Sequence, residues 1–205
     1  MGFSVKQADD AFERGHYPDD AIFFFDFDGV LATQCEEKVF RLPEKDMERR
    51  RLEELADLVG IHHELYPNTG YLRHIVYQIM AHGTTPEPHT EAVRFAHELD
   101  LLGDPYFILT ARTATAAVKR MLQFVERYGV NPQETFCLGR ASKAGMLAAL
   151  RKDWGPVPFV FFEDSQHHID ACLALNDPLL EVVKIEWPSC TENAEKLRAH
   201  HLGVL

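Results

Sequence analysis

The stretch FFFDFDGVLA, residues 23–32, places two carboxylates directly after an aromatic run. Three consecutive phenylalanines with a fourth at Phe27 are typical of a strand buried on both faces of a sheet. An ionised carboxylate at such a place is costly unless a cation compensates for its charge. Asp26 and Asp28 therefore mark either a solvated strand end or a site where something cationic lies between them.

The spacing of the two aspartates favours a shared site. Alternate residues of a strand point to the same face, roughly 7 Å apart, so Asp26 and Asp28 are expected to flank one small group. Gly29 permits a tight turn and a close approach of the backbone. Mg²⁺ takes oxygen ligands from one or two carboxylates, with water and substrate phosphate completing its shell. The pair alone leaves both interpretations open, since short motifs also occur by chance.

Short apolar runs recur along the chain, with helical patterns between them. The candidate strands are residues 21–27, 105–111, 135–139, 158–164 and 181–187. The candidate helices that follow or separate them are residues 90–100, 113–129, 142–155, 167–176 and 191–203. Continuous apolar strands separated by helices predict an α/β fold, a Rossmann-like parallel sheet with helices on both faces.

One long stretch breaks this alternation. It contains no strand pattern, and its apolar spacing predicts two amphipathic helices at residues 44–60 and 70–83. Residues 84–89, TTPEPH, have the composition of a linker. Insertions at the carboxyl ends of sheet strands are where ligand sites and lids are found. The expected domains are a core of residues 1–32 and 89–205 and a small all-helical cap of residues 33–88.

Composition excludes several classes of protein. The chain has 205 residues and a formal net charge of -11, which argues against a nucleic-acid partner or an anionic membrane surface. No apolar run reaches the length of a membrane span, and the first residues lack a signal-peptide core. The four cysteines form no C-x-x-C pair, so neither a zinc site nor a disulfide framework is indicated. We expect a cytoplasmic protein, with the oligomeric state left open.

Polar side chains stand at the ends of the predicted strands. Thr110 ends the second strand, Lys143 begins the helix after the third, and Glu163 with Asp164 ends the fourth. The carboxyl ends of parallel strands lie at one edge of a sheet. Together with the two aspartates of the first strand, the topology is expected to gather four carboxylates, one hydroxyl and one ammonium there.

These residues and their order resemble the motifs of the haloacid dehalogenase-like (HAD) superfamily of phosphohydrolases. DFDGVL resembles the first motif, ILTAR the second and FFEDS the fourth, and Lys143 matches the third. The resemblance covers residues 21 to 187, and the helical insertion is similar to the small helical cap of that family. It implies a Mg²⁺-dependent phosphatase that hydrolyses a small phosphorylated metabolite.

The resemblance also implies roles for individual residues. Asp26 matches the nucleophile that forms an aspartyl-phosphate, and Asp28 matches the general acid/base. Lys143 is further expected to lower the pKa of Asp26, as a nearby cation does. The residues expected to bind phosphate or substrate are Thr110, Ala111, Arg112 and Lys143, and those expected at the metal are Asp26, Asp28, Glu163 and Asp164. Because Glu163 stands where an aspartate pair is common, the direct metal ligand in this motif stays open.

Several alternatives remain open from the sequence. A phosphotransferase or mutase would use the same aspartyl-phosphate, and a non-catalytic binding protein would keep only the fold. Arg112 is expected either to contact the substrate or the acid cluster, or to be solvated at a helix start. Because His167 and His168 follow the fourth motif, one of them is expected to border the site.

Overall fold

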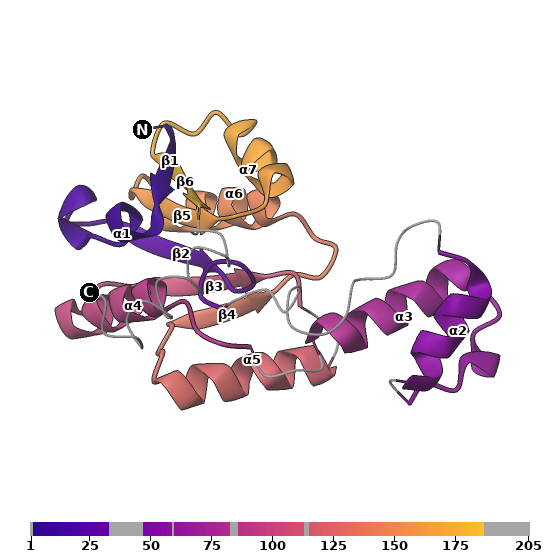
Figure 1. Cartoon of the computed structure of the whole chain (residues 1–205). Coiled ribbons are helices and arrows are strands. Elements are labelled where there is room, and N and C mark those ends of the chain that lie inside the picture. The colour runs from indigo at the N-terminus through magenta and orange to yellow at the C-terminus, as the bar shows by residue number, and fades with distance from the viewer. Residues whose placement is uncertain (1, 33–46, 59, 83–85, 113–114, 187–205) are drawn as a thin grey trace.

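A wholly parallel sheet forms the centre of the molecule (Figure 1). The computed structural model describes residues 2–32, 47–58, 60–82, 86–112 and 115–186. The strands are β1 (Phe3–Gln7), β2 (Ile22–Asp26), β3 (Tyr106–Thr110), β4 (Glu134–Cys137), β5 (Phe159–Glu163) and β6 (Leu180–Glu186). They pair in the order β1-β6-β5-β2-β3-β4, which places β2 between β5 and β3. The predicted α/β fold with a parallel sheet is confirmed.

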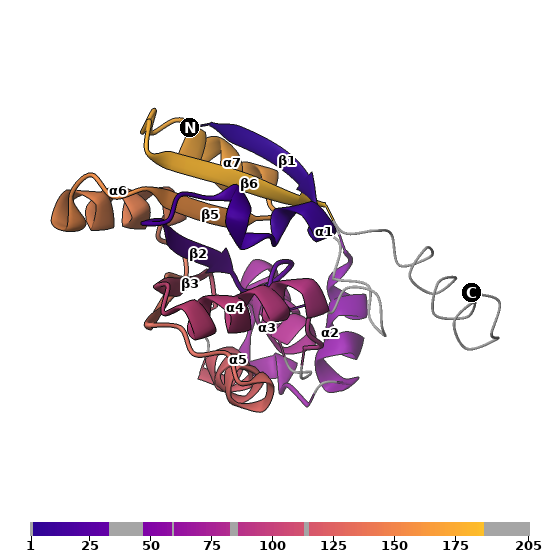
Figure 2. The same cartoon turned by 90° about the vertical axis from the view of Figure 1, so that its left-hand side faces the viewer.

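Helices cover both faces of this sheet (Figure 2). The helices are α1 (Ala8–Ala11), α2 (Arg49–Leu58), α3 (Thr69–His82), α4 (Thr90–Leu102), α5 (Thr115–Tyr128), α6 (Lys143–Trp154) and α7 (Gln166–Leu173), with short 3-10 turns η1 (Arg14–His16) and η3 (His63–Leu65). Residues of α1, α4 and α5 share one apolar cluster with the sheet, and residues of α6 and α7 share another. Within the described residues, none of these helices is both long and apolar enough to cross a bilayer.

The aromatic run explains the central position of β2. Phe23 and Phe25 belong to the cluster under α1, α4 and α5, whereas Phe24 belongs to the cluster under α6 and α7. All three side chains are fully buried, as expected for a strand covered on both faces. Each buried phenylalanine contributes roughly 1.5–3 kcal/mol relative to an exposed one. The strand that carries Asp26 is therefore fixed from both sides.

Strand β1 is not predicted by the sequence analysis. It pairs only with β6, at one edge of the sheet, and its Phe3 and Val5 side chains remain 44% and 49% exposed. An edge strand that is incompletely covered needs no continuous apolar run, so the pattern used for the other strands does not detect it. The predicted helix at residues 191–203 lies outside the described residues.

The helices of the insertion form a unit with its own small core. Its buried residues are Leu52, Ala56, Ile61, Leu72 and Val76. The two predicted helices are present as α2 and α3, and this unit stands away from the sheet, with α3 packed against α5 (Figure 1). The cap boundaries at residues 33–88 stay a prediction, because residues 33–46 and 83–85 lie outside the described part of the chain.

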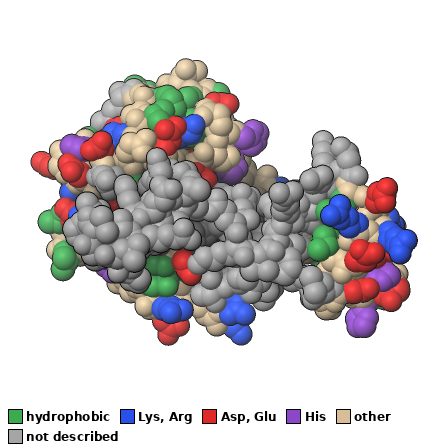
Figure 3. Space-filling model, in the orientation of Figure 1, with side chains coloured by type: hydrophobic (Ala, Val, Ile, Leu, Met, Phe, Trp, Pro, Cys, Tyr) green, Lys and Arg blue, Asp and Glu red, His purple; other side chains and the backbone are tan. Residues whose placement is uncertain are grey.

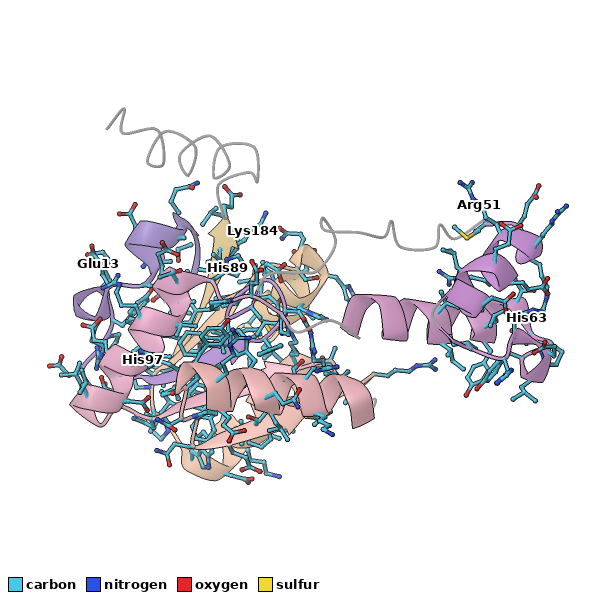
Figure 4. All side chains as sticks on the ribbon, turned by 60° about the horizontal axis from the view of Figure 1, so that its bottom comes forward. Glu13, Arg51, His63, His89, His97 and Lys184 are labelled. Carbon is cyan, nitrogen blue, oxygen red and sulfur yellow. The ribbon has the colours of Figure 1, made fainter. Side chains whose placement is uncertain are left out.

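The two chain segments that join the insertion to the core lie side by side. Ala32 and Pro88 form an antiparallel bridge, and the His89 amide donates to the Leu31 carbonyl at 3.0 Å. In Figure 4, His89 lies with the core, whereas Arg51 and His63 lie on the distant helical unit. Ala32 and Pro88 thus close the base of the insertion.

Candidate active site

The two aspartates of the first motif lie in different local structures. Strand β2 ends at Asp26, and the chain then turns: the Gly29 amide donates to Ala32 at 2.8 Å, and the Ala32 amide to Phe27 at 2.9 Å. Gly29 has a φ of 84°, a backbone conformation that favours glycine. The strand thus ends at Asp26, one residue before the predicted end at residue 27, and Asp28 lies in the turn that follows; that the two carboxylates flank one small group stays a prediction.

Asp26 shares a buried ammonium with the fourth motif. The Lys143 Nζ lies 2.7 Å from Asp26 Oδ2 and 2.7 Å from Glu163 Oε2. Lys143 is the first residue of α6, which Ser142 caps by accepting a hydrogen bond from the Gly145 amide. All three charged side chains of this group are buried. The start of α6 therefore delivers the lysine between the ends of β2 and β5.

Glu163 uses both of its carboxylate oxygens inside the protein. Oε1 accepts from the amides of Asp164 and Ser165 at 3.2 and 3.0 Å. Oε2 accepts from Lys143 and, at 3.2 Å, from the Nδ1 of His168. Burial raises the pKa of Glu163, but the His168 hydrogen bond and the Lys143 charge outweigh it and lower the pKa to about 2. Glu163 is thus a fixed anion that holds Lys143 and His168.

The pKa of Asp26 is set by burial and by Glu163 more than by Lys143. Burial raises it, the negative charge of Glu163 raises it further, and the opposing effect of Lys143 is smaller, so the pKa lies well above its ordinary value. For Lys143, burial lowers the pKa, but the charges of Asp26 and Glu163 outweigh this and raise it overall. Lys143 therefore lowers the Asp26 pKa as expected, but desolvation and the charge of Glu163 outweigh this contribution.

Asp28 is paired with Arg112 instead. The Arg112 Nε and Nη2 donate to the two Asp28 oxygens at 2.8 and 2.6 Å, a bidentate ion pair. The Arg112 amide also donates to Thr110 Oγ1 at 3.2 Å, which ties this residue to the end of β3. Arg112 is only 2% exposed, so the solvated alternative for this residue is wrong. Ala111, between Thr110 and Arg112 in the sequence, is exposed.

Asp164 lies against the turn of the first motif. A Cβ atom on Gly29 would lie only 2.1 Å from Asp164 Oδ2, so the glycine is needed for space as well as for its φ. Burial, and then the charge of Glu163, raise the pKa of Asp164 to about 7. Among the described residues, carboxyl groups of the first and fourth motifs therefore outnumber the cationic side chains that pair with them.

The residues present fit one divalent cation. Four carboxylates (Asp26, Asp28, Glu163 and Asp164) face two cationic side chains (Lys143 and Arg112), a formal balance of four minus two, or two negative charges. The raised pKa values of Asp26 and Asp164 agree with this deficit. Oxygen ligands are those that Mg²⁺ prefers.

A second cluster of groups that could bind a metal already surrounds the ammonium of Lys143. Single ligand atoms of Asp26, Glu163 and His168 lie within 4.8 Å of one another. Lys143 Nζ lies 2.7 Å from both carboxylates, so the ammonium is the cation they share. The Asp164 carboxyl group, which lies against Gly29, takes no part in this arrangement.

The topology brings the predicted site residues to the ends of three strands and the start of α6. The described geometry groups them as Asp26 with Lys143 and Glu163, and Asp28 with Arg112 next to Thr110. His168 is the residue of the histidine pair that reaches the site, through Glu163. His168 follows Glu163 by five residues and lies in the first turn of α7. The sequence shows this spacing, but it is not part of the fourth motif.

Comparison with known proteins identifies the family. The 5'-nucleotidase family model matches residues 9–182. No curated protein matches the chain.

Solved structures of low sequence identity resemble the chain over most of its length. A candidate beta-phosphoglucomutase from Thermotoga maritima is 17% identical, covers 80% of this chain and 94% of its own, and has a TM-score of 0.47. A hydrolase from Streptococcus pneumoniae is 13% identical (86% and 97% covered, TM-score 0.44), and a HAD-superfamily hydrolase from Ehrlichia chaffeensis is 12% identical (86% and 94% covered, TM-score 0.45). From the family match over residues 9–182, the resemblance to HAD-superfamily phosphohydrolases is confirmed, and the chain belongs to the 5'-nucleotidase family.

Proposed function

We propose that the protein is a Mg²⁺-dependent phosphomonoesterase in which Asp26 attacks phosphorus. The observation that carries this proposal is the state of Asp26: it is buried at the end of the central strand, 2.7 Å from Lys143, with Asp28 on the adjoining turn. A structural role would not need a second carboxylate two residues away from a buried one. A nucleophile with a neighbouring acid/base needs this arrangement.

Each residue of the site has a task in this reaction. An oxygen of Asp26 bonds to phosphorus as the bond from phosphorus to the leaving oxygen breaks, which gives an aspartyl-phosphate and an alcohol. Asp28 protonates the leaving oxygen and then takes a proton from the water that hydrolyses the intermediate. The Lys143 ammonium and the Thr110 hydroxyl donate hydrogen bonds to the transferring phosphoryl oxygens.

Among the acids of the fourth motif, Asp164 suits a metal better than Glu163. Each carboxylate oxygen of Glu163 already accepts two hydrogen bonds, from Lys143 and His168 or from two backbone amides. Asp26 and Asp164 would hold Mg²⁺, with the turn at Asp28 beside them. The bound ion supplies positive charge to the transferring oxygens.

For the substrate, we propose a nucleoside 5'-monophosphate. The support is the family match, whose name denotes this activity, and the small phosphorylated metabolite that the sequence indicates belongs to the same wider class. The helical unit of α2 and α3 stands beside the catalytic edge through its contact with α5, and it is the part of the chain that we expect to distinguish one phosphate ester from another.

The test is phosphate release from a panel of phosphate esters. Purified protein is incubated with nucleoside 5'-monophosphates, sugar phosphates and an aryl phosphate, with Mg²⁺ or with EDTA, and inorganic phosphate is measured. We expect release that requires Mg²⁺ and is fastest for a nucleoside monophosphate. Isomerised product or phosphate transferred to an added alcohol, without net release, would instead identify a mutase or phosphotransferase, and no turnover of any ester would refute the enzyme proposal.

A further inference from the structure

We propose that Arg112 is a positioning residue for Asp28: it fixes the orientation of the proton donor and does not bind the substrate phosphate. This inference rests on the proposed function, because it assigns the arginine a part in the same reaction. It concerns the step at which the leaving oxygen takes its proton.

The geometry of the ion pair is the first argument. Arg112 contacts both oxygens of Asp28, at 2.8 and 2.6 Å, and such a two-point contact fixes the plane of a carboxylate as well as its distance. Asp28 follows the end of β2 on a turn, and its side chain is 27% exposed. Arg112 therefore provides a contact that restricts the rotamers of this partly exposed carboxylate.

The arginine is itself held from three directions. Its Nη1 donates to the Ala117 carbonyl at 3.1 Å, and its guanidinium carbon lies 4.7 Å from the centre of the Phe27 ring. Its amide donates to Thr110. A guanidinium has five N–H donors, and contacts to Asp28 and Ala117 engage three of them.

Burial argues against direct contact with a substrate. Only 2% of Arg112 is exposed, so little of its surface is available to a phosphate group. Two of its five N–H donors make no contact with Asp28 or Ala117, but the burial of the side chain leaves them little room to reach a substrate. Lys143 and Thr110 already stand at the strand ends where the phosphoryl oxygens are expected.

The same arginine links the acid to the helical unit. Ala117 belongs to the first turn of α5, and α5 packs against α3. Asp28 is thereby linked through Arg112 to α5, the helix that the insertion contacts. A proton donor must lie within hydrogen-bond reach of the leaving oxygen, and a misplacement of about 1 Å can cost about 100-fold in rate.

Arg112→Lys tests the proposal, because lysine keeps the charge but cannot make the two-point contact. We compare kcat/KM for an alkyl phosphate, which needs protonation of its leaving group, with kcat/KM for an aryl phosphate, which needs it less. The variant is expected to lose about 10- to 100-fold more activity on the alkyl than on the aryl phosphate, in proportion to the usual contribution of a general acid.

Arg151→Lys is the matched control. Arg151 also pairs with a carboxylate, Asp177 at 2.8 Å, and its guanidinium carbon lies 3.8 Å from the centre of the Phe159 ring. This pair lies between the end of α6 and the segment before β6, at the sheet edge opposite the catalytic one. Its loss is expected to lower the melting temperature and to leave the ratio of alkyl to aryl activity unchanged.

A double-mutant cycle separates positioning from other roles. Asp28→Asn alone should show the same preference for aryl over alkyl phosphate, and Arg112→Lys added to it should shift the ratio no further. An equal loss on both substrates with a raised KM would overturn the proposal in favour of phosphate binding. An unchanged ratio would overturn it in favour of a structural role.

The outcomes also separate this inference from the proposed function. If the wild-type protein hydrolyses phosphate esters but Arg112→Lys keeps the ratio, only the positioning role fails. If the wild-type protein turns over no ester, the proposed function fails and the positioning role with it. In that case, coupling between the two positions measured by chemical unfolding still reports whether the ion pair stabilises the turn.

Discussion

Several charged side chains at the catalytic edge of the sheet, where the strands have their carboxyl ends, are buried, whereas several of those in the helical unit are exposed. At the edge, Arg112, Lys143 and Glu163 are 2%, 3% and 0% exposed, and each has a partner of opposite charge. In the helical unit, the Arg50 side chain is 89% exposed and its ion pair with Glu54 measures 3.6 Å. Acidic and basic side chains lie on the outer surface of that unit in Figure 3.

The two regions also differ in the size of their apolar cores. The sheet is held by two large clusters that include a dense set of phenylalanine rings, whereas the buried core of the helical unit comprises five of the residues whose side chains are described. Regions with few buried apolar contacts open more easily than the core of the same protein. From this difference we expect the chemistry to belong to the region with the large core, and substrate discrimination to the helical unit, which we expect to open more easily.

Asp26→Asn should produce the largest effect in the region with the large core. The amide keeps the shape of the side chain but lacks the attacking oxygen, and loss of a nucleophile commonly costs more than about 10⁴-fold in kcat. Phosphate release under saturating substrate measures the effect, and a thermal melt checks that the fold persists. Near-normal turnover in a clean preparation would sink the assignment of Asp26 as nucleophile.

Gly29→Ala should come next, because the added Cβ would lie 2.1 Å from Asp164 Oδ2. We expect a higher Mg²⁺ concentration at half-maximal activity and about 10- to 100-fold lower kcat/KM, as the displaced carboxyl leaves its position. Gly103→Ala is the control, since Gly103 has a similar φ of 75° but nothing within 4 Å of an added Cβ. Equal Mg²⁺ dependence in the two variants would mean that backbone strain alone explains the loss.

Leu72→Ala tests the helical unit by removing one of its few core side chains. Cavities of this kind cost about 2–5 kcal/mol, which is a large part of the stability available to a small cluster. We expect the unit to unfold before the sheet, and kcat/KM for a nucleoside monophosphate to fall more than that for a small aryl phosphate. Leu147→Ala, in the core under α6, should instead lower the single main transition. The comparison between regions breaks if both variants give the same unfolding profile.

Arg49 and Arg50 allow the finest comparison, because they are neighbours on α2. Arg49 donates to Glu53 at 2.7 Å and to the Tyr66 carbonyl at 3.0 Å, which joins α2 to the segment before α3. Arg50 forms an exposed ion pair with Glu54. Arg49→Ala should lower the melting temperature of the helical unit by a few degrees, whereas Arg50→Ala should leave it unchanged. A larger decrease for Arg50→Ala than for Arg49→Ala would show that packing does not decide how much each arginine stabilises the helical unit.

The sequence predicts those elements whose burial produces a clear apolar pattern, either a continuous run or a helical spacing. Strands β2, β3 and β5 are continuous apolar runs because both of their faces are covered, and the run alone identifies them. Strand β1 is missed because its side chains alternate at an exposed edge. The identity of the candidate site residues follows from strand ends, which is a matter of topology.

The pairing inside the site does not follow from topology. Whether Asp28 continues a strand or enters a turn depends on hydrogen bonds that only the folded chain shows. The direction of the Asp26 pKa depends on the balance between burial and one shared ammonium, and sequence spacing carries no measure of burial. The distinction between Glu163 and Asp164 likewise requires a count of hydrogen bonds around each carboxylate.

The bridge between Ala32 and Pro88 has a consequence for how such a chain can change. Because these residues are adjacent in space, the sheet experiences the insertion as a closed loop with a fixed base. The entropy of closing a loop grows slowly, by only about 0.6 kcal/mol for each doubling of its length. We therefore expect that the insertion can be lengthened, shortened or exchanged for another at little cost to the stability of the sheet.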